Sequence, residues 1–142
     1  MGLDETITAY RQACADVVNG DATALKGLYS EGDDVSLANP WGPARCGRAG
    51  VFEAVGRAAT QFRDGGPRAE PHDTVALFLG TDLACLVENE RWQAKVAGGD
   101  EVSAFDLRAT TVFRQEDRGW KVVHRHADPI TTPNPRGPLR PG

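Results

Sequence analysis

The chain has 142 residues, of which 40% are hydrophobic and 25% are charged, and its formal net charge is −4. This length and composition predict one globular domain with a single core. Lysine and arginine are scattered along the chain and do not form blocks, which argues against a nucleic-acid or membrane partner. No apolar run approaches the ~20 residues that span a bilayer, and the N-terminus lacks an export-signal pattern, so we expect a cytoplasmic protein.

Two helices are predicted within the first thirty residues. Apolar side chains recur at helical spacing along residues 3–18, at Ile7, Tyr10, Cys14 and Val17. Asn19-Gly20 ends this helix, and Asp21 is placed to cap a second helix over residues 22–29. The two segments together predict a helical hairpin.

A short strand and a third helix follow. Residues 34–39 are typical of a strand that ends at Asn39-Pro40, because proline cannot extend a ladder. A period of 3.6 residues returns over residues 49–62, which predicts a third helix. The segment Asp64-Gly65-Gly66-Pro67 is predicted to close it.

The second half of the chain is rich in β-formers. Strands are predicted at residues 74–79, 83–96, 101–114 and 120–127, and the turns between them are short enough for hairpins. The last fifteen residues hold five prolines and no apolar period. We therefore predict one domain over residues 1–128 and an extended tail over residues 129–142.

Helices followed by a meander of strands predict an α+β fold. We expect three N-terminal helices on a strongly bent, mostly antiparallel sheet, in the order α-α-β-α-β-β-β-β. Long strands that curl around helices form a cone, and the space between sheet and helices is the expected place for a ligand.

The three cysteines suggest no covalent or metal chemistry. Cys14, Cys46 and Cys85 are odd in number and far apart, so they indicate neither a disulfide framework nor a zinc motif. His124 and His126 alternate on one strand, but two ligands at this spacing are a weak metal signal. We predict no metal and no cofactor.

Period-two alternation selects candidate pocket residues on the last strand. Trp120, Val122, His124 and His126 share one face, which we expect to face inward, whereas Arg125 lies on the other. A histidine near Glu90 could act as a general base, and the alternative is a hydrogen-bonded structural histidine.

The strand at residues 83–96 carries two carboxylates, Glu88 and Glu90, on the same face as Trp92. The pattern leaves open which face is inside. Either carboxylate could pair with Arg108 or Thr110 of the neighbouring strand. A Glu90–Arg108 pair is interpreted either as a buried functional pair or as a salt bridge on the rim.

Four features of the chain resemble a known superfamily. They are "VVNGDATALKGLYSEGDDVSLANPWGP", "GRAGVFEAV", "LRATTVFRQEDRGWKVVHRHAD", and the order of helices before meander. Together they cover about residues 5–128, and they are similar to SnoaL-like members of the ketosteroid-isomerase-like, nuclear-transport-factor-2-like superfamily. The resemblance implies the cone fold and a homodimer formed through the sheet.

The same resemblance implies that the steroid isomerase machinery is missing. In ketosteroid isomerases the corner after the first strand carries an aspartate base, and the matching residue here is Asn39, an amide that accepts no proton at neutral pH. The isomerases also use a tyrosine on the first helix and a protonated aspartate in the sheet. The residues that match here are Ala13, Thr110 and Thr111.

Two functions remain as hypotheses. The first is a cone that binds a small apolar or alicyclic molecule, with possible cofactor-free acid/base catalysis such as isomerisation, dehydration or cyclisation. The predicted catalytic residues are His124, Glu90 and Arg108, and the predicted ligand-binding residues are Asn39, Trp41, Glu88, Trp92, Thr110 and His126. The second is a non-catalytic homodimeric module whose outward apolar residues, such as Val87 or Phe113, form the contact.

Overall fold

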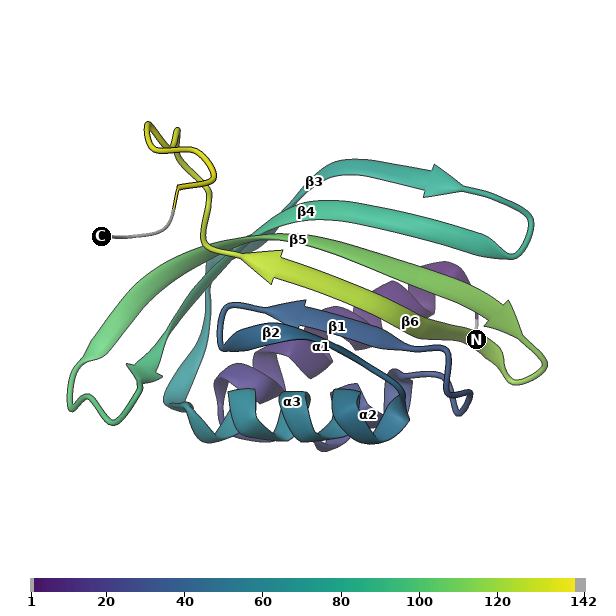
Figure 1. Cartoon of the computed structure of the whole chain (residues 1–142), viewed down its shortest axis with the longest axis horizontal. Helices are drawn as coiled ribbons and strands as arrows, with labels where there is room; N and C mark the ends of the chain where they lie inside the picture. Colours follow the sequence, from purple (N-terminus) through teal and green to yellow (C-terminus); the bar gives the residue numbers. More distant parts are fainter. Residues whose placement is uncertain (1, 140–142) are drawn as a thin grey trace.

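The structure, a computed structural model, describes residues 2–139. Three helices cover one face of a curled sheet (Figure 1). The helices are α1 (Leu3–Val18), α2 (Thr23–Leu28) and α3 (Arg48–Thr60). The strands are β1 (Ser36–Asn39), β2 (Gly42–Cys46), β3 (Phe62–Leu79), β4 (Leu83–Val96), β5 (Val102–Glu116) and β6 (Gly119–Asp128).

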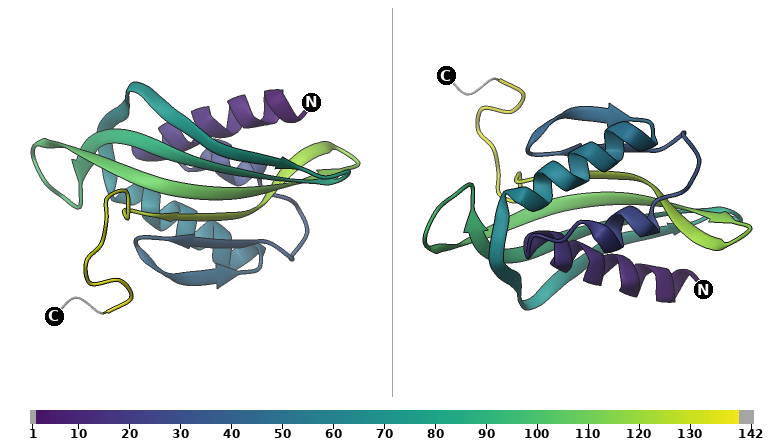
Figure 2. Two further views of the ribbon diagram at one scale, coloured as in Figure 1. Left: turned by 90° about the horizontal axis from the view of Figure 1, so that it is seen from above. Right: turned by 90° about the horizontal axis from the view of Figure 1, so that it is seen from below.

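The strands described within residues 2–139 form one sheet in the order β2-β1-β6-β5-β4-β3. Neighbouring strands are antiparallel except β1 and β6, which are parallel. The sheet curls without closing into a barrel, and α1 and α3 lie beneath its two halves (Figure 2). The predicted α+β cone is therefore confirmed, with one strand more than expected.

The additional strand is β2, at a place where the sequence predicts a turn. Gly42 pairs with Asn39, and Cys46 pairs with Ser36. Pro43 lies within this strand, which is possible because β2 is the outer edge of the sheet and needs no hydrogen bonds on its free side.

Strand β3 begins at Phe62, twelve residues before the predicted start at Thr74. Its first half contains the predicted turn residues Gly65, Gly66 and Pro67, and its pairing with β4 is interrupted by irregularities. A Cβ atom on Gly65 would lie 2.7 Å from Ala94 Cα, so the backbones of β3 and β4 approach closely there. Since β3 is the other edge of the sheet, it also tolerates prolines.

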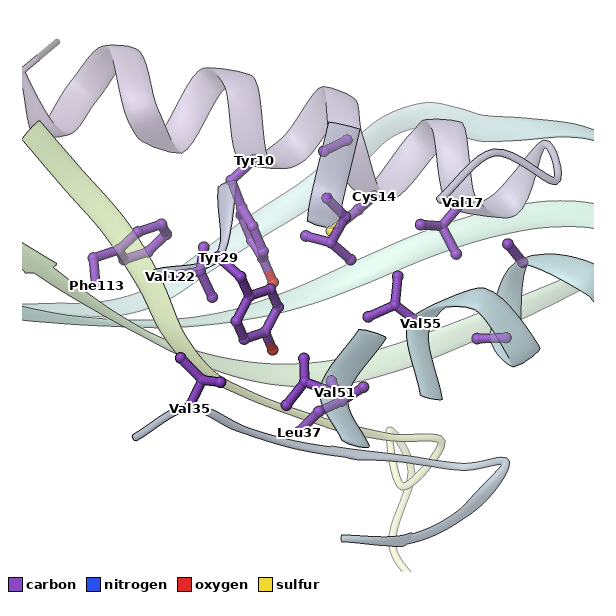
Figure 3. Close-up of a cluster of buried hydrophobic side chains, with 14 of the residues drawn as sticks. Tyr10, Cys14, Val17, Tyr29, Val35, Leu37, Val51, Val55, Phe113 and Val122 are labelled. Atoms are coloured by element: carbon purple, nitrogen blue, oxygen red, sulfur yellow. The ribbon is translucent and has the colours of Figure 1, made fainter. Parts of the chain in front are cut away.

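The core lies between the helices and the sheet. Figure 3 shows Tyr10, Cys14 and Val17 projecting from α1 toward the side on which Val51 and Val55 of α3 lie. Phe113 of β5 packs edge-on against the Tyr10 ring, with 5.4 Å between ring centroids. The apolar faces predicted for the two long helices are thus the faces that they bury.

A β-bulge in β6 leaves Val122 on the expected inner face and reverses the expected faces of the residues that follow it. Val122 pairs with Phe113 and His124 pairs with Val112, so Val123 is an extra residue without an opposite partner. Val122 and Val123 are both buried, and beyond them Arg125 and Ala127 are buried. The prediction that the face of His124 and His126 points inward is therefore wrong, because one inserted residue shifts the alternation.

Residues 129–139 contain neither helix nor strand, and most of their side chains are exposed. This segment leaves the end of β6 and runs away from the body of the domain (Figure 1). The predicted tail extends to residue 142, and its last three residues lie outside the described part of the chain. The division at residue 128 stays a prediction.

Candidate ligand-binding cavity

A cavity of about 450 Å³ lies between the helices and the curled sheet. Most of its wall is aliphatic or aromatic. The ring of Phe62 stacks on Phe105 with 5.3 Å between centroids and meets Trp41 edge-on at 5.6 Å. These three rings come from the β1–β2 turn, β3 and β5, so the apolar wall depends on the long curl of the sheet.

Three predicted ligand-binding residues line this cavity: Asn39, Trp41 and Trp92. The side-chain oxygen of Asn39 accepts a hydrogen bond from the backbone N–H of Trp41 at 3.0 Å. This Asx turn holds the corner after β1 and orients the indole. Within residues 2–139 the amide nitrogen of Asn39 has no acceptor, which makes it available to donate to a ligand.

Arg125 contributes a charged group to the wall and forms a buried ion pair with Glu90. Its Nη1 and Nη2 atoms donate to Glu90 Oε2 and Oε1 at 2.8 and 2.9 Å. Trp92 Nε1 donates to Glu90 Oε1 at 3.0 Å, and Arg125 Nη1 also donates to the hydroxyl of Tyr10. The Tyr10 hydroxyl is 2.6 Å from Thr111 Oγ1.

Electrostatics in this network favour the ionised pair. Burial alone would raise the pKa of Glu90, but the charge and hydrogen bonds of Arg125 and the indole of Trp92 bring it below its ordinary value. Burial opposes the charge of Arg125, yet Glu90 holds the pKa of the guanidinium well above its ordinary value. Glu90 is therefore a fixed counter-ion and a poor proton acceptor.

A second polar group, made of Arg11, His72 and Glu88, joins α1 to the sheet. Arg11 donates to Glu88 Oε2 from Nη2 at 2.9 Å and from Nε at 3.2 Å. Burial raises the pKa of Glu88 against the opposing effect of Arg11. Burial lowers the pKa of His72; the charge of Glu90 opposes this shift, and the charges of Arg11 and Arg125 add to it.

His72, Glu88 and Glu90 are the potential metal ligands that come together in the described residues. One ligand atom of each lies within 4.8 Å of the others. Glu88 Oε1 and His72 Nδ1 are buried without a hydrogen-bond partner and lie 3.7 Å apart. Glu90, however, is occupied on both oxygens, and Arg11 and Arg125 already balance the two carboxylates. The group is thus a poor match to a divalent cation.

The remaining predicted residues lie on the outer face of the sheet. Arg108 does not pair with Glu90; its Nε donates to Asp128 at 2.7 Å, and its side chain is 57% exposed. Thr110 is paired with His126, whose side chain is 54% exposed. His124 Nδ1 shares a hydrogen bond with Ser36 Oγ at 2.7 Å, and burial lowers its pKa. The structure therefore does not bring His124, Glu90 and Arg108 together.

Sequence reasoning missed Arg125, Tyr10 and His72 as members of the interior network. Simple alternation places Arg125 on the outer face, because the bulge at Val123 has no signature in the sequence. The helical spacing of Tyr10 predicts only a place in the apolar stripe of α1. The one available signal was a buried-strand carboxylate, Glu90, which requires a cationic partner on a facing element.

Comparison with known proteins supports the fold described above. A family model described as "SnoaL-like domain" matches residues 6–131. The chain belongs to the SnoaL-like domain family. No match is found among functionally curated proteins.

Solved structures share the SnoaL-like fold at low sequence identity. An NTF2-like superfamily protein from Salmonella enterica is 18% identical, with a TM-score of 0.76 over 95% of this chain and 93% of the other. A Streptomyces avermitilis protein, provisionally named an NTF2-like dehydratase, is 21% identical, with a TM-score of 0.75 over 92% and 95%. A Thiobacillus denitrificans protein, provisionally named a calcium/calmodulin-dependent protein kinase II association domain, is 21% identical, with a TM-score of 0.71 over 92% and 96%.

The helices of this SnoaL-like domain were compared with the requirements of a membrane span. Among the helices of residues 2–139, none combines the length and apolar character needed to cross a bilayer.

Proposed function

We propose that this SnoaL-like domain binds a small, uncharged and largely apolar molecule in the cavity. The observation that carries the proposal is the cavity itself, whose volume of about 450 Å³ falls in the range of small-molecule sites. Its stacked aromatic wall offers a flat apolar surface, which suits an aromatic or alicyclic ligand.

The chemistry of the wall supports binding more than acid/base catalysis. Among the described residues that line the cavity, none is a carboxylate or a histidine. Cys14 lines it, but burial raises the pKa of this thiol to about 12, so it carries no thiolate at neutral pH. Glu90 lies behind Arg125 and Trp92 and is committed to both. A group that removes a proton from a bound ligand is therefore lacking among these wall residues.

The proposal is tested by filling the cavity. Ala58 of α3 is buried in the wall, so Ala58→Phe would occupy the space that a ligand needs. The matched control is Ala44→Phe on the exposed edge strand β2. Uncharged polycyclic compounds should raise the melting temperature of the native protein and of the control, and leave the Ala58→Phe protein unchanged. Equal shifts in all three proteins would contradict cavity binding.

Native mass spectrometry of the purified protein gives an independent readout. A co-purifying small molecule should appear with the native protein and be absent from the Ala58→Phe protein. The same measurement reports the stoichiometry of the chain, which bears on a second candidate function.

The second candidate is homodimerisation through the outer face of the sheet. On this face Phe78, Cys85 and Val112 lie side by side across β3, β4 and β5, and Val87 is the next outward residue of β4. Phe78 is 62% exposed and belongs to this contiguous apolar patch, which is the kind of surface that marks a protein contact. Phe113, predicted to belong to this surface, is instead fully buried in the core.

Charge introduced on this face tests the dimer. Val87→Glu places two like charges close together if the face meets its own copy around a two-fold axis. We expect analytical ultracentrifugation to show a dimer for the native protein and a monomer for Val87→Glu, with cavity binding retained. A change at Glu70, which is exposed on β3, serves as the control.

A further inference from the structure

The hydrogen bonds of Arg125 use only part of its guanidinium. Glu90 occupies the edge formed by Nη1 and Nη2, and the second Nη1–H donates to Tyr10. Figure 3 shows the side chain of Tyr10 projecting from α1 into the interior, and the hydrogen bond from Arg125 to its hydroxyl fixes this side of the guanidinium. Three of the five N–H groups of Arg125 are thereby committed.

The two remaining donors, Nε–H and the second Nη2–H, lie on one edge and point in parallel. Within residues 2–139 neither has an acceptor, and Arg125 is part of the cavity wall. Nε is not fully buried, and because Arg125 lines the cavity we infer that this edge faces it. Such an edge matches the lone pairs of one carbonyl oxygen or one carboxylate.

The charge balance of the site selects between these two acceptors. Glu90 is fully buried and already neutralises Arg125. No other cationic side chain is found among the described wall residues. A ligand carboxylate would leave one uncompensated negative charge in an apolar cavity, which is strongly unfavourable, whereas a neutral carbonyl adds none.

We propose that Arg125 recognises a carbonyl oxygen of an uncharged apolar ligand through its free Nε–H and Nη2–H edge. This inference rests on the proposed function of the cavity and assigns a specific ligand chemistry to it. Arg125 both closes the ion pair with Glu90 and orients the ligand, while the aromatic wall binds the ligand's hydrocarbon part.

The test compares two flat tricyclic probes that differ in one group, 9-fluorenone, which has a carbonyl, and fluorene, which lacks it. Calorimetry on the native protein should show that fluorenone binds about tenfold or more tightly than fluorene, as expected for a hydrogen bond from a charged donor. Fluorene-9-carboxylate should bind more weakly than fluorenone.

Arg125→Lys is the matching variant, because lysine keeps a positive charge beside Glu90 but has no such edge. The preference for fluorenone over fluorene should fall to near unity in this variant, because only fluorenone has a hydrogen bond to lose. If the variant fails to fold, infrared spectroscopy of the native complex still decides. The carbonyl stretch of bound fluorenone should move to lower frequency than in an apolar solvent.

The outcomes distinguish the role of Arg125 in recognising a carbonyl from the proposed binding of ligands in the cavity. Equal binding of fluorenone and fluorene, or an unshifted carbonyl stretch, overturns the role of Arg125 and leaves cavity binding intact. Tightest binding of the carboxylate overturns the choice of a neutral carbonyl. Failure of all three probes to bind counts against the cavity as a site for such compounds and removes the basis of the inference.

Discussion

Arg125 and Glu90 form a two-bond ion pair inside the domain, although their strands, β6 and β4, are separated by β5. The pair can form because both side chains lie on the inner face of a sheet that curls around them. It is the point at which the apolar cavity meets the polar network beneath α1. Four tests follow from this arrangement and from the backbone that supports it.

Breaking the pair should cost far more stability than replacing it. Arg125→Met leaves Glu90 buried without its counter-ion, and we expect a loss of about 3–5 kcal/mol in the free energy of unfolding. The double variant Glu90→Gln/Arg125→Met keeps an acceptor for Trp92 and removes both charges, so most of this loss should be recovered. Urea denaturation measures both, and equal losses would argue against a buried ion pair.

Glu88 should make stability depend on pH. Its pKa in the folded state is raised above the ordinary 4.5, so the folded protein binds this proton more tightly than the unfolded chain. The stabilising contribution is complete below pH 4.5 and is lost as pH rises through the raised pKa. Relative to the native protein, Glu88→Gln should therefore gain stability between pH 4.5 and 7.

The control for this pH effect is Glu53→Gln, because Glu53 is exposed on α3. Thermal unfolding of the three proteins over the same pH range measures the effect, and the change with pH should be larger for Glu88→Gln than for this exposed control. A difference for Glu88→Gln that moves in the opposite direction would show that Arg11 outweighs burial at this site.

The bulge at Val123 should be essential for stability, because it sets which side chains of β6 face the core. Deleting Val123 would turn His124 and His126 inward and Arg125 outward, with a loss that we place above about 4 kcal/mol. Val123→Ala keeps the bulge and removes two methyl groups, so it should cost only about 1–2 kcal/mol. Near-ultraviolet circular dichroism distinguishes them: the deletion should lose its tertiary signal, and the substitution should keep it.

Adjacent glycines in β3 should respond differently to the same change. A Cβ on Gly65 would collide with Ala94 and the backbone of Gln93, whereas a Cβ on Gly66 meets nothing within 4 Å. We expect Gly65→Ala to lower the free energy of unfolding by about 1–3 kcal/mol and Gly66→Ala to be nearly neutral. Comparable melting temperatures for the two variants would contradict the close approach of β3 and β4.

The fold was predictable because most elements carry a clear period. The stripe containing Tyr10 and Cys14 gave α1 its correct bounds, and the long alternation around Trp92 gave those of β4. Strand β2 and the first half of β3 were not predicted, because Pro43 and Pro67 are typical of turns. Only their positions at the two edges of the sheet make proline acceptable, and edge position is a property of the whole fold.

The site was predictable only in part, for a similar reason. Asn39, Trp41 and Trp92 could be placed at the cavity from the sequence because a corner and a buried strand are local features, while their roles in binding stay a prediction. The partner of Glu90 was not found, since it lies two strands away and its orientation depends on one extra residue in β6. Arg108 is a nearer neighbour in the sheet, but it lies on the opposite face.

The parallel pairing of β1 with β6 links the first strand of the domain to the last. While the ribosome is still making the chain, β1 has only β2 to pair with. The β1–β2 hairpin and the helices around it therefore cannot join the main sheet until β6 has formed. The domain is therefore expected to assemble only once β6 is present, and a chain truncated before Gly119 should remain sensitive to protease.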